Sequence, residues 1–165
     1  LLFLARGDSG RNTLNKVKLD LNQMVSEVWE ESQMIDEKHR YLFRGTDPAY
    51  MTGDIAMIKQ SIRIFVQNAA KYSSDGADIT LGVMLESGYV SYMIQDEGIG
   101  MESSDVVHIF ERFYRSDEAR NSETGGSGLG LSIAKWIVDA HSGTIQVVSR
   151  PEIGTRFIVR FPMCE

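Results

Sequence analysis

The sequence predicts an α/β (α+β) fold, a two-layer sandwich in which about three helices pack on one face of a mixed, largely antiparallel sheet of five or more strands. Three observations lead to this prediction. An apolar stripe of helical period runs through residues 55–72, alternating segments pair as hairpins at 79–95 and 144–161, and helices and strands follow one another in mixed order without strand–helix–strand repeats. The 165 residues, 42% hydrophobic and 24% charged, have the composition of one globular domain.

Composition also limits the classes of function. The net charge is −6 and Lys and Arg form no dense cluster, which argues against nucleic acid or an anionic membrane surface as the main partner. The single cysteine, Cys164, excludes an internal disulfide and suits a reducing compartment, so we expect a cytoplasmic domain. No apolar run reaches the ~20 residues that span a bilayer. The chain starts at Leu1 without Met and shows no signal peptide, and we expect a fragment of a longer protein.

The first elements are short. Residues 16–21 alternate between apolar and polar and predict a half-buried strand. Asn22 is expected to cap a helix over 23–38. A short strand at 41–43 and a turn at 46–48 follow. The expected inner face of the helix consists of Met24, Val25, Val28, Trp29 and Ser32.

The next helix, over residues 55–72, is the clearest in the chain. Asp54 is a plausible cap for it. Asn68 and Lys71 are three residues apart and therefore project from one face. An amide oxygen beside an ammonium group suits Mg²⁺ and phosphate, although Asn68 taken alone could equally be an ordinary polar residue near a helix end. The apolar stripe consists of Ile58, Ile62, Phe65, Val66 and Ala69.

A carboxylate followed by two glycines ends the hairpin of strands 79–85 and 89–95. The segment is Asp96-Glu97-Gly98-Ile99-Gly100. A carboxylate at a strand end can accept a hydrogen bond from a ligand, and the glycines let backbone approach a flat ligand closely. Alone, this pattern is also typical of a tight turn.

A glycine-rich stretch precedes the last long helix. Residues 105–110 predict one or two helical turns, and the aromatics in 110–115 are expected to anchor the chain. The polar segment 116–127 has no periodicity and predicts a long loop. It runs through Gly126-Ser127-Gly128 into a helix over 129–140, whose N-terminus is a potential anion site. The stretch has neither the Lys of a Walker loop nor the directly preceding strand of a dinucleotide fingerprint.

Residues 16–162 resemble the catalytic ATP-binding domain of bacterial two-component sensor histidine kinases, in the superfamily shared with gyrase, a heat-shock chaperone and mismatch-repair ATPases. The resemblance implies a Bergerat-type ATP-binding fold. The matching pieces, in the order of the family, are Asn68 with Lys71 and Tyr72, Asp96 to Gly100, Phe110 to Arg115, Gly126 to Leu131, and Gly154-Thr155.

This resemblance also implies roles for single residues. Asn68 would hold Mg²⁺, Lys71 and Arg115 would contact phosphates, and these three are the expected catalytic residues. Asp96 would bind the adenine amino group, and residues 116–127 would form a mobile lid. The complete set of expected ATP contacts is Asn68, Lys71, Tyr72, Asp96, Gly98, Gly100, Arg115, Gly126, Ser127, Gly128, Leu129, Gly130, Leu131 and Thr155.

The implied reaction is transfer of the γ-phosphoryl group of ATP to a histidine on an upstream domain, and onward to an aspartate of a response regulator. Residues 1–15 are expected to be the end of the dimerisation and phosphoacceptor helix with its linker, and 16–165 the catalytic domain. The full-length protein would be a homodimer anchored in the cell membrane. The histidines of this chain are poor acceptor candidates, because none has the sequence context that the family uses: His39, His108 and His141.

Two alternatives remain open. One is an ATP hydrolase of the same superfamily, driven by nucleotide-dependent dimer closure, and the other is a degenerate nucleotide-binding module. Many kinases of the family carry Asn four residues before the position of Asn68, and the hydrolases carry Glu there, whereas this chain has Ile64. The absent Glu disfavours the hydrolase, and the presence of Asp96 and the glycines disfavours the degenerate module.

Overall fold

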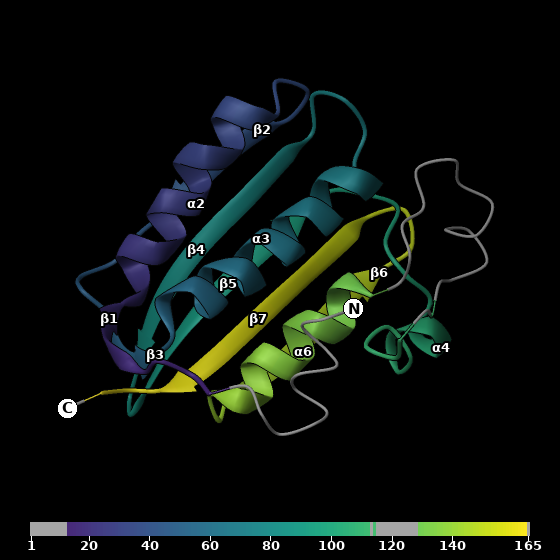
Figure 1. Ribbon diagram of the computed structural model, residues 1–165. Coiled ribbons are helices and arrows are strands. Elements are labelled where there is room, and N and C mark those ends of the chain that lie inside the picture. Colours follow the sequence, from purple (N-terminus) through teal and green to yellow (C-terminus); the bar gives the residue numbers. More distant parts are fainter. Residues whose placement is uncertain (1–12, 113, 115–128, 165) are drawn as a thin grey trace.

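The computed structural model describes residues 13–112, 114 and 129–164 (Figure 1). The elements, in chain order, are β1 (Val17–Asp20), α2 (Leu21–Ile35), β2 (Arg40–Arg44), β3 (Tyr50–Gly53), α3 (Ile55–Tyr72), β4 (Asp78–Glu86), β5 (Tyr89–Asp96), α4 (Ser103–Val106), α6 (Gly130–Ala140), β6 (Thr144–Arg150) and β7 (Gly154–Pro162).

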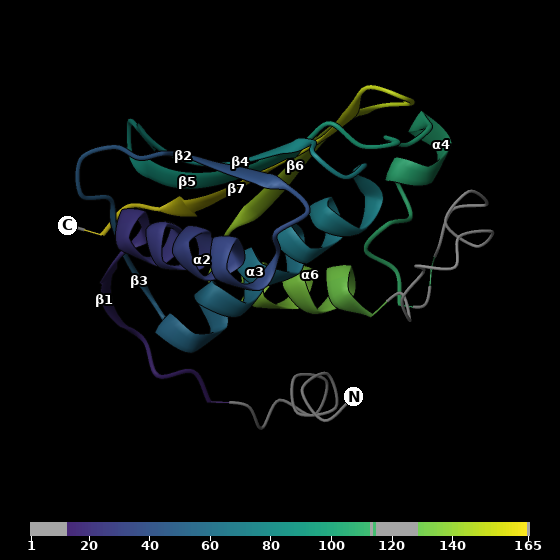
Figure 2. The same cartoon turned by 90° about the horizontal axis from the view of Figure 1, so that it is seen from above.

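Helices and sheet form two layers. The five-stranded sheet has the order β2-β4-β5-β7-β6, and α2, α3 and α6 cover one of its faces (Figure 2). Only the pair β2 and β4 is parallel, and the other neighbours are antiparallel. The predicted sandwich with a mixed, largely antiparallel sheet is therefore confirmed.

The start of the chain differs from the sequence-based prediction in three details. The cap of α2 is Asp20, whose Oδ1 accepts the N–H groups of Asn22 at 3.0 Å and Ala49 at 2.9 Å. Asn22, the predicted cap, lies inside the helix, and its Oδ1 accepts the N–H of Thr46 at 2.9 Å. The helix ends at Ile35 because Asp36 is extended, three residues earlier than predicted.

A strand was also missed. No strand was predicted between the turn at 46–48 and Asp54, but β3 lies there and pairs antiparallel with β1 as a separate two-stranded sheet. Four residues are too few to show a period, so only the partner strand reveals this element.

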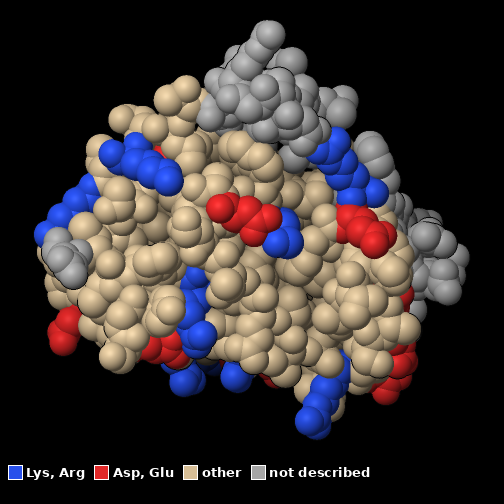
Figure 3. Space-filling view, turned by 90° about the horizontal axis from the view of Figure 1, so that it is seen from below, with Lys and Arg blue, Asp and Glu red and all other residues tan. Residues whose placement is uncertain are grey.

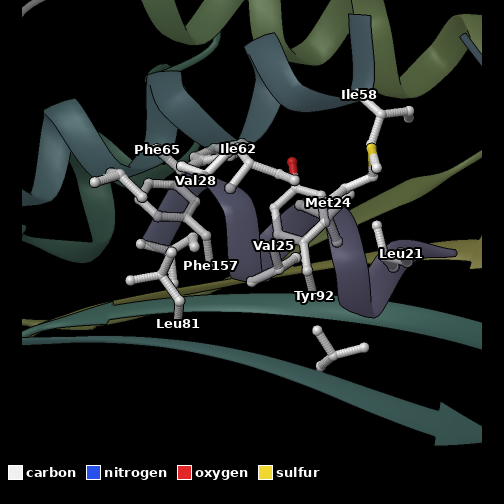
Figure 4. Packing of buried hydrophobic residues seen from close by; sticks show 14 of the residues in the cluster. Leu21, Met24, Val25, Val28, Ile58, Ile62, Phe65, Leu81, Tyr92 and Phe157 are labelled. Carbon is white, nitrogen blue, oxygen red and sulfur yellow. The ribbon is translucent and has the colours of Figure 1, made fainter. Parts of the chain in front are cut away.

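The core lies between α3 and the central strands (Figure 4). All five residues of the predicted α3 stripe are buried. The Phe65 ring lies 4.7 Å from that of Phe157 and 6.2 Å from that of Tyr92, measured between centroids. The hydroxyl of the fully buried Tyr92 lies 2.8 Å from Ser61 Oγ, so its polar atom is satisfied. Burial of each such side chain contributes about 1.5–3 kcal/mol, which fixes α3 against β5 and β7.

Candidate functional site

Asp96 ends β5 with a buried carboxylate. The residue is 6% exposed, and its Oδ1 accepts the N–H of Gly98 at 2.8 Å and that of Thr155 at 3.2 Å. Thr155 is its direct partner on β7 in the strand register. Oδ2 makes no hydrogen bond to any residue that the structure describes. One carboxylate oxygen is thus fixed by backbone, while the other meets no donor in the described part of the chain.

Burial gives this carboxylate an unusual electrostatic state. Loss of solvent raises the pKa of Asp96 above its usual value, and the hydrogen bonds from the Gly98 and Thr155 amides offset only part of that rise. A desolvated carboxylate benefits from a further hydrogen-bond donor. Asp96 is therefore suited to bind an N–H group of a ligand.

The glycines after Asp96 hold the loop between two other backbone segments. A Cβ at Gly98 would lie 2.4 Å from Tyr72 O at the end of α3, and a Cβ at Gly100, where φ is +68°, would lie 1.9 Å from Arg150 O at the end of β6. The Ile99 N–H donates to Tyr72 O at 3.2 Å, and the Ile99 carbonyl accepts the N–H of Glu152 at 2.6 Å. In the structure these glycines allow close contacts with two other backbone segments of the protein.

Ser149 is a member of this region that the sequence did not single out. Its Oγ accepts the Met101 N–H at 2.9 Å and lies 2.8 Å from Thr155 Oγ1. It therefore joins the loop after β5 to the strands that carry the partner of Asp96. Its only sequence signal was its place across from Thr155 in the last hairpin.

The C-terminal end of α3 carries the predicted metal and phosphate residues. Asn68 is half-buried, and its side chain makes no hydrogen bond to any described residue. Lys71 Nζ lies 5.5 Å from the centroid of the Tyr72 ring. Tyr72 O contacts the glycine loop, as described above, so this end of α3 and the Asp96 loop form one region.

The start of α6 lies against the middle of α3. Leu129, the N-cap of α6, makes no side-chain cap, and no described side chain binds the first backbone N–H groups of the helix. A Cβ at Gly130 would lie 3.6 Å from Ile64 Cγ2, and Ile64 is only 7% exposed. Leu131 is partly buried against the core. The remaining predicted contacts lie outside the described residues: Arg115, Gly126, Ser127 and Gly128.

Two histidines have their ring nitrogens engaged in the fold. His141 is buried, with Nδ1 2.7 Å from Ile137 O and Nε2 3.0 Å from the Asp54 N–H, so it is neutral with the proton on Nδ1. Burial lowers its pKa. His39 contacts Asp36 and Ser73. The third, His108, is exposed beside Glu111.

Charged side chains do not gather by sign on the face that Figure 3 shows. Basic and acidic residues are scattered there over a largely uncharged surface. None of the described helices is both long enough and apolar enough to cross a membrane.

Known proteins with the same pattern identify the class of this domain. The model of the family described as histidine kinase-, DNA gyrase B-, and HSP90-like ATPase matches residues 53–165. The sensor histidine kinase YkoH of Bacillus subtilis is 37% identical over 161 residues, which cover 98% of this chain and 35% of YkoH. WalK of the same organism is 34% identical over 169 residues, covering 100% of this chain and 28% of WalK.

Solved structures share the fold. The catalytic domain of the histidine kinase ThkA superposes with a TM-score of 0.78 at 24% identity, covering 90% of this chain and 98% of that one. Full-length ShkA in complex with AMPPNP superposes with a TM-score of 0.84 at 22% identity, covering 99% of this chain and 34% of that one.

This chain belongs to the family of histidine kinase-, DNA gyrase B- and HSP90-like ATPases. Within it, the chain is an ATP-binding catalytic domain of the sensor histidine kinase type. The chain spans only about a third of the length of such curated relatives.

Proposed function

We propose that this domain binds Mg·ATP and transfers the γ-phosphoryl group to a histidine on an upstream domain, for relay to an aspartate of a response regulator. The observation that carries the proposal is that two polar side chains without a described hydrogen-bond partner lie in the same region. Among the residues that the structure describes, neither Oδ2 of Asp96 at the end of β5 nor the side-chain amide of Asn68 near the end of α3 has a hydrogen-bond partner. The Tyr72–Ile99 backbone hydrogen bond joins the two segments that carry them.

In the proposed site, the adenine binds at the end of β5, and the Mg²⁺ and the phosphates bind near the C-terminal end of α3. Asp96 and Thr155 bind the adenine, since a buried acceptor suits the adenine amino group. Asn68 holds Mg²⁺, because a neutral amide oxygen is a suitable single ligand for an ion that rides on nucleotide phosphates. Lys71 and Arg115 bind phosphate oxygens. When bound, Mg²⁺ neutralises charge on the phosphates, and the protein contributes mainly positioning.

The surroundings of Ile64 disfavour hydrolysis as the main activity. Hydrolysis needs a base or an orienting group beside the attacking water. Ile64, one turn before Asn68, is buried against the first residue of α6 and has no group that could orient water. The polar groups of Asp96 and Asn68, which have no hydrogen-bond partner among the described residues, likewise favour a working nucleotide site over a degenerate module.

The greater length of the relatives supports a proposal for the wider organisation of the protein. We propose that residues 1–15 close a dimerisation and phosphoacceptor helix and that 16–165 form the catalytic domain. The whole protein would then be a homodimer with its catalytic domain in the cytoplasm and an anchor in the cell membrane.

Incubation with γ-labelled ATP tests the reaction. The isolated chain should bind Mg·ATP without labelling itself, and a separate domain with the acceptor histidine should become labelled. Phosphate release without the acceptor should be slower than this transfer by on the order of a hundredfold, because no base assists water. Rapid release without acceptor would favour the hydrolase. Label on the chain itself would return His39, His108 or His141 to consideration.

Base selectivity tests the role of Asp96. Adenine presents an amino group where guanine presents a carbonyl, and an acceptor facing the buried carboxylate costs about 1–3 kcal/mol. We therefore expect ATP and ADP to displace a labelled ATP analogue at concentrations at least on the order of tenfold lower than GTP. Equal competition by GTP would contradict the assignment.

A further inference from the structure

His39 lies between the ends of two helices. It follows α2 in the connection to β2, and its side chain is only 5% exposed. Nδ1 lies 2.6 Å from Oδ2 of Asp36, the residue that ends α2. Nε2 lies 3.1 Å from the carbonyl oxygen of Ser73, the residue that ends α3.

Both partners of the ring can only accept hydrogen bonds. The Asp36 carboxylate already accepts the Tyr41 hydroxyl at 2.6 Å and the Lys38 N–H at 2.8 Å, as an ionised carboxylate does. A backbone carbonyl has no proton to donate. Both contacts of His39 are hydrogen bonds only when each ring nitrogen carries a hydrogen, which is the imidazolium form of the ring.

The surroundings of His39 favour this positive charge. Carboxylates face it from the end of α2, at Asp36, and from the turn after α3, at Asp75, while the Tyr41 ring of β2 stands edge-on at 6.5 Å. The charge also lies at the C-terminal end of α3, where the helix dipole is negative. Burial lowers the pKa of His39, but the hydrogen bonds to Asp36 and Ser73 and the two negative charges outweigh it and raise the pKa.

The C-terminal end of α3, which His39 contacts, also contacts the loop after Asp96 in the proposed nucleotide site. Ser73 directly follows Tyr72, whose carbonyl accepts the Ile99 N–H. Two successive carbonyls at the C-terminal end of α3, those of Tyr72 and Ser73, are thus bound by different parts of the chain, the first by the loop after Asp96 and the second by His39. The Gly76 N–H donates to the Lys38 carbonyl, and the Arg40 N–H donates to the Ala77 carbonyl. These backbone hydrogen bonds join the connection after α2 to the turn after α3. His39 adds a side-chain contact to the carbonyl of Ser73 at the helix end itself.

We propose that protonated His39 is a positioning residue for nucleotide binding, which holds the C-terminal end of α3 against the loop after Asp96, so that affinity falls when the ring loses its proton. This inference rests on the proposed nucleotide site. It adds a dependence of nucleotide affinity on pH, which the roles proposed for Asn68, Lys71 and Asp96 do not include.

The pH range of the effect follows from the direction of the pKa shift. A histidine whose pKa is raised by folding makes its full contribution below the unfolded value of 6.5, and the contribution is lost as pH rises through the folded value. The fall in nucleotide affinity is therefore expected above pH 6.5. His141, whose pKa is lowered, changes charge on the acidic side and does not interfere.

Calorimetric titration with Mg·ADP at pH 7 and pH 9 tests the proposal. The phosphates of ADP are ionised throughout this range, because they titrate near pH 6. The dissociation constant of the wild-type chain should rise on the order of fivefold between the two pH values, a typical coupling between linked sites. His39→Asn, which stays neutral, should bind weakly at both pH values. His39→Arg, which stays charged, should bind well at both.

His108→Asn is the matched control. His108 has the same spacing to a carboxylate, with Nδ1 2.9 Å from Glu111 Oε1, but its side chain is 48% exposed and contacts no end of α3. This variant should retain the pH dependence of the wild type. A purely structural role of His39 would change thermal stability equally in His39→Asn and His39→Arg without separating their pH profiles.

The outcomes distinguish a failure of the positioning role of His39 from a failure of the proposed nucleotide site. Wild-type binding that does not change between pH 7 and pH 9, or His39→Asn with the profile of the wild type, overturns the positioning role alone. Failure of the folded wild-type chain to bind Mg·ADP at either pH overturns the nucleotide site and this inference with it.

Discussion

Replacement of Asn68 by alanine is expected to abolish Mg²⁺-dependent nucleotide binding and to lower phosphotransfer by on the order of a hundredfold to a thousandfold, as does the loss of one directed charge-stabilising group in other enzymes. The reason is that the amide is the proposed protein ligand of the ion. Asn68 makes no hydrogen bond to any described residue, so no contact in the described part of the chain depends on this amide. The measurements are Mg²⁺-dependent binding of a labelled nucleotide and transfer to an acceptor domain.

Gln67→Ala provides the control for this variant. Gln67 is the exposed neighbour of Asn68 on α3, and its replacement removes an amide of the same kind from a different face. Both variants should unfold near the wild-type temperature, since exposed and unpaired polar groups add little stability. Phosphotransfer at the wild-type rate by Asn68→Ala would show that the metal is held elsewhere.

Gly100→Ala is expected to destabilise the domain by about 2–5 kcal/mol, the sum of a left-handed backbone and a forced contact. The φ angle of +68° disfavours any Cβ, and that Cβ would lie 1.9 Å from Arg150 O. The clash is with backbone of the β6–β7 hairpin, which is held by strand pairing and cannot move alone. Nucleotide affinity should fall as well, because the displaced loop carries Asp96. Urea unfolding and ADP titration measure the two effects.

Gly76→Ala is the control that separates the cost of a positive φ angle from the cost of a steric clash. Gly76 also has a positive φ, of +85°, but nothing lies within 4 Å of the position its Cβ would occupy. This variant should lose only the backbone contribution, about 1–2 kcal/mol, with unchanged nucleotide binding. Equal losses of stability in both variants would mean that the approach of the Asp96 loop to Arg150 is not tight.

The sequence alone was sufficient for features with a local pattern. The α3 stripe repeats every three to four residues, and all five of its members are buried as predicted. Alternation likewise predicted the hairpin of β4 and β5, whose end places Asp96. Such periods depend only on the backbone geometry of a helix or a strand, which is why they are readable without the fold.

Only the tertiary structure decided contacts between residues far apart in the chain. Asp20 rather than Asn22 caps α2, because Asp20 Oδ1 also binds the N–H of Ala49. Gly98 and Gly100 must be glycine because the end of α3 and the end of β6 approach them. The pKa of His39 is raised, against the effect of its burial, by its contacts with Asp36 and with the Ser73 carbonyl on the other side of the ring. The physical reason is common to all three: each depends on a partner that the chain brings near only after the sheet has formed.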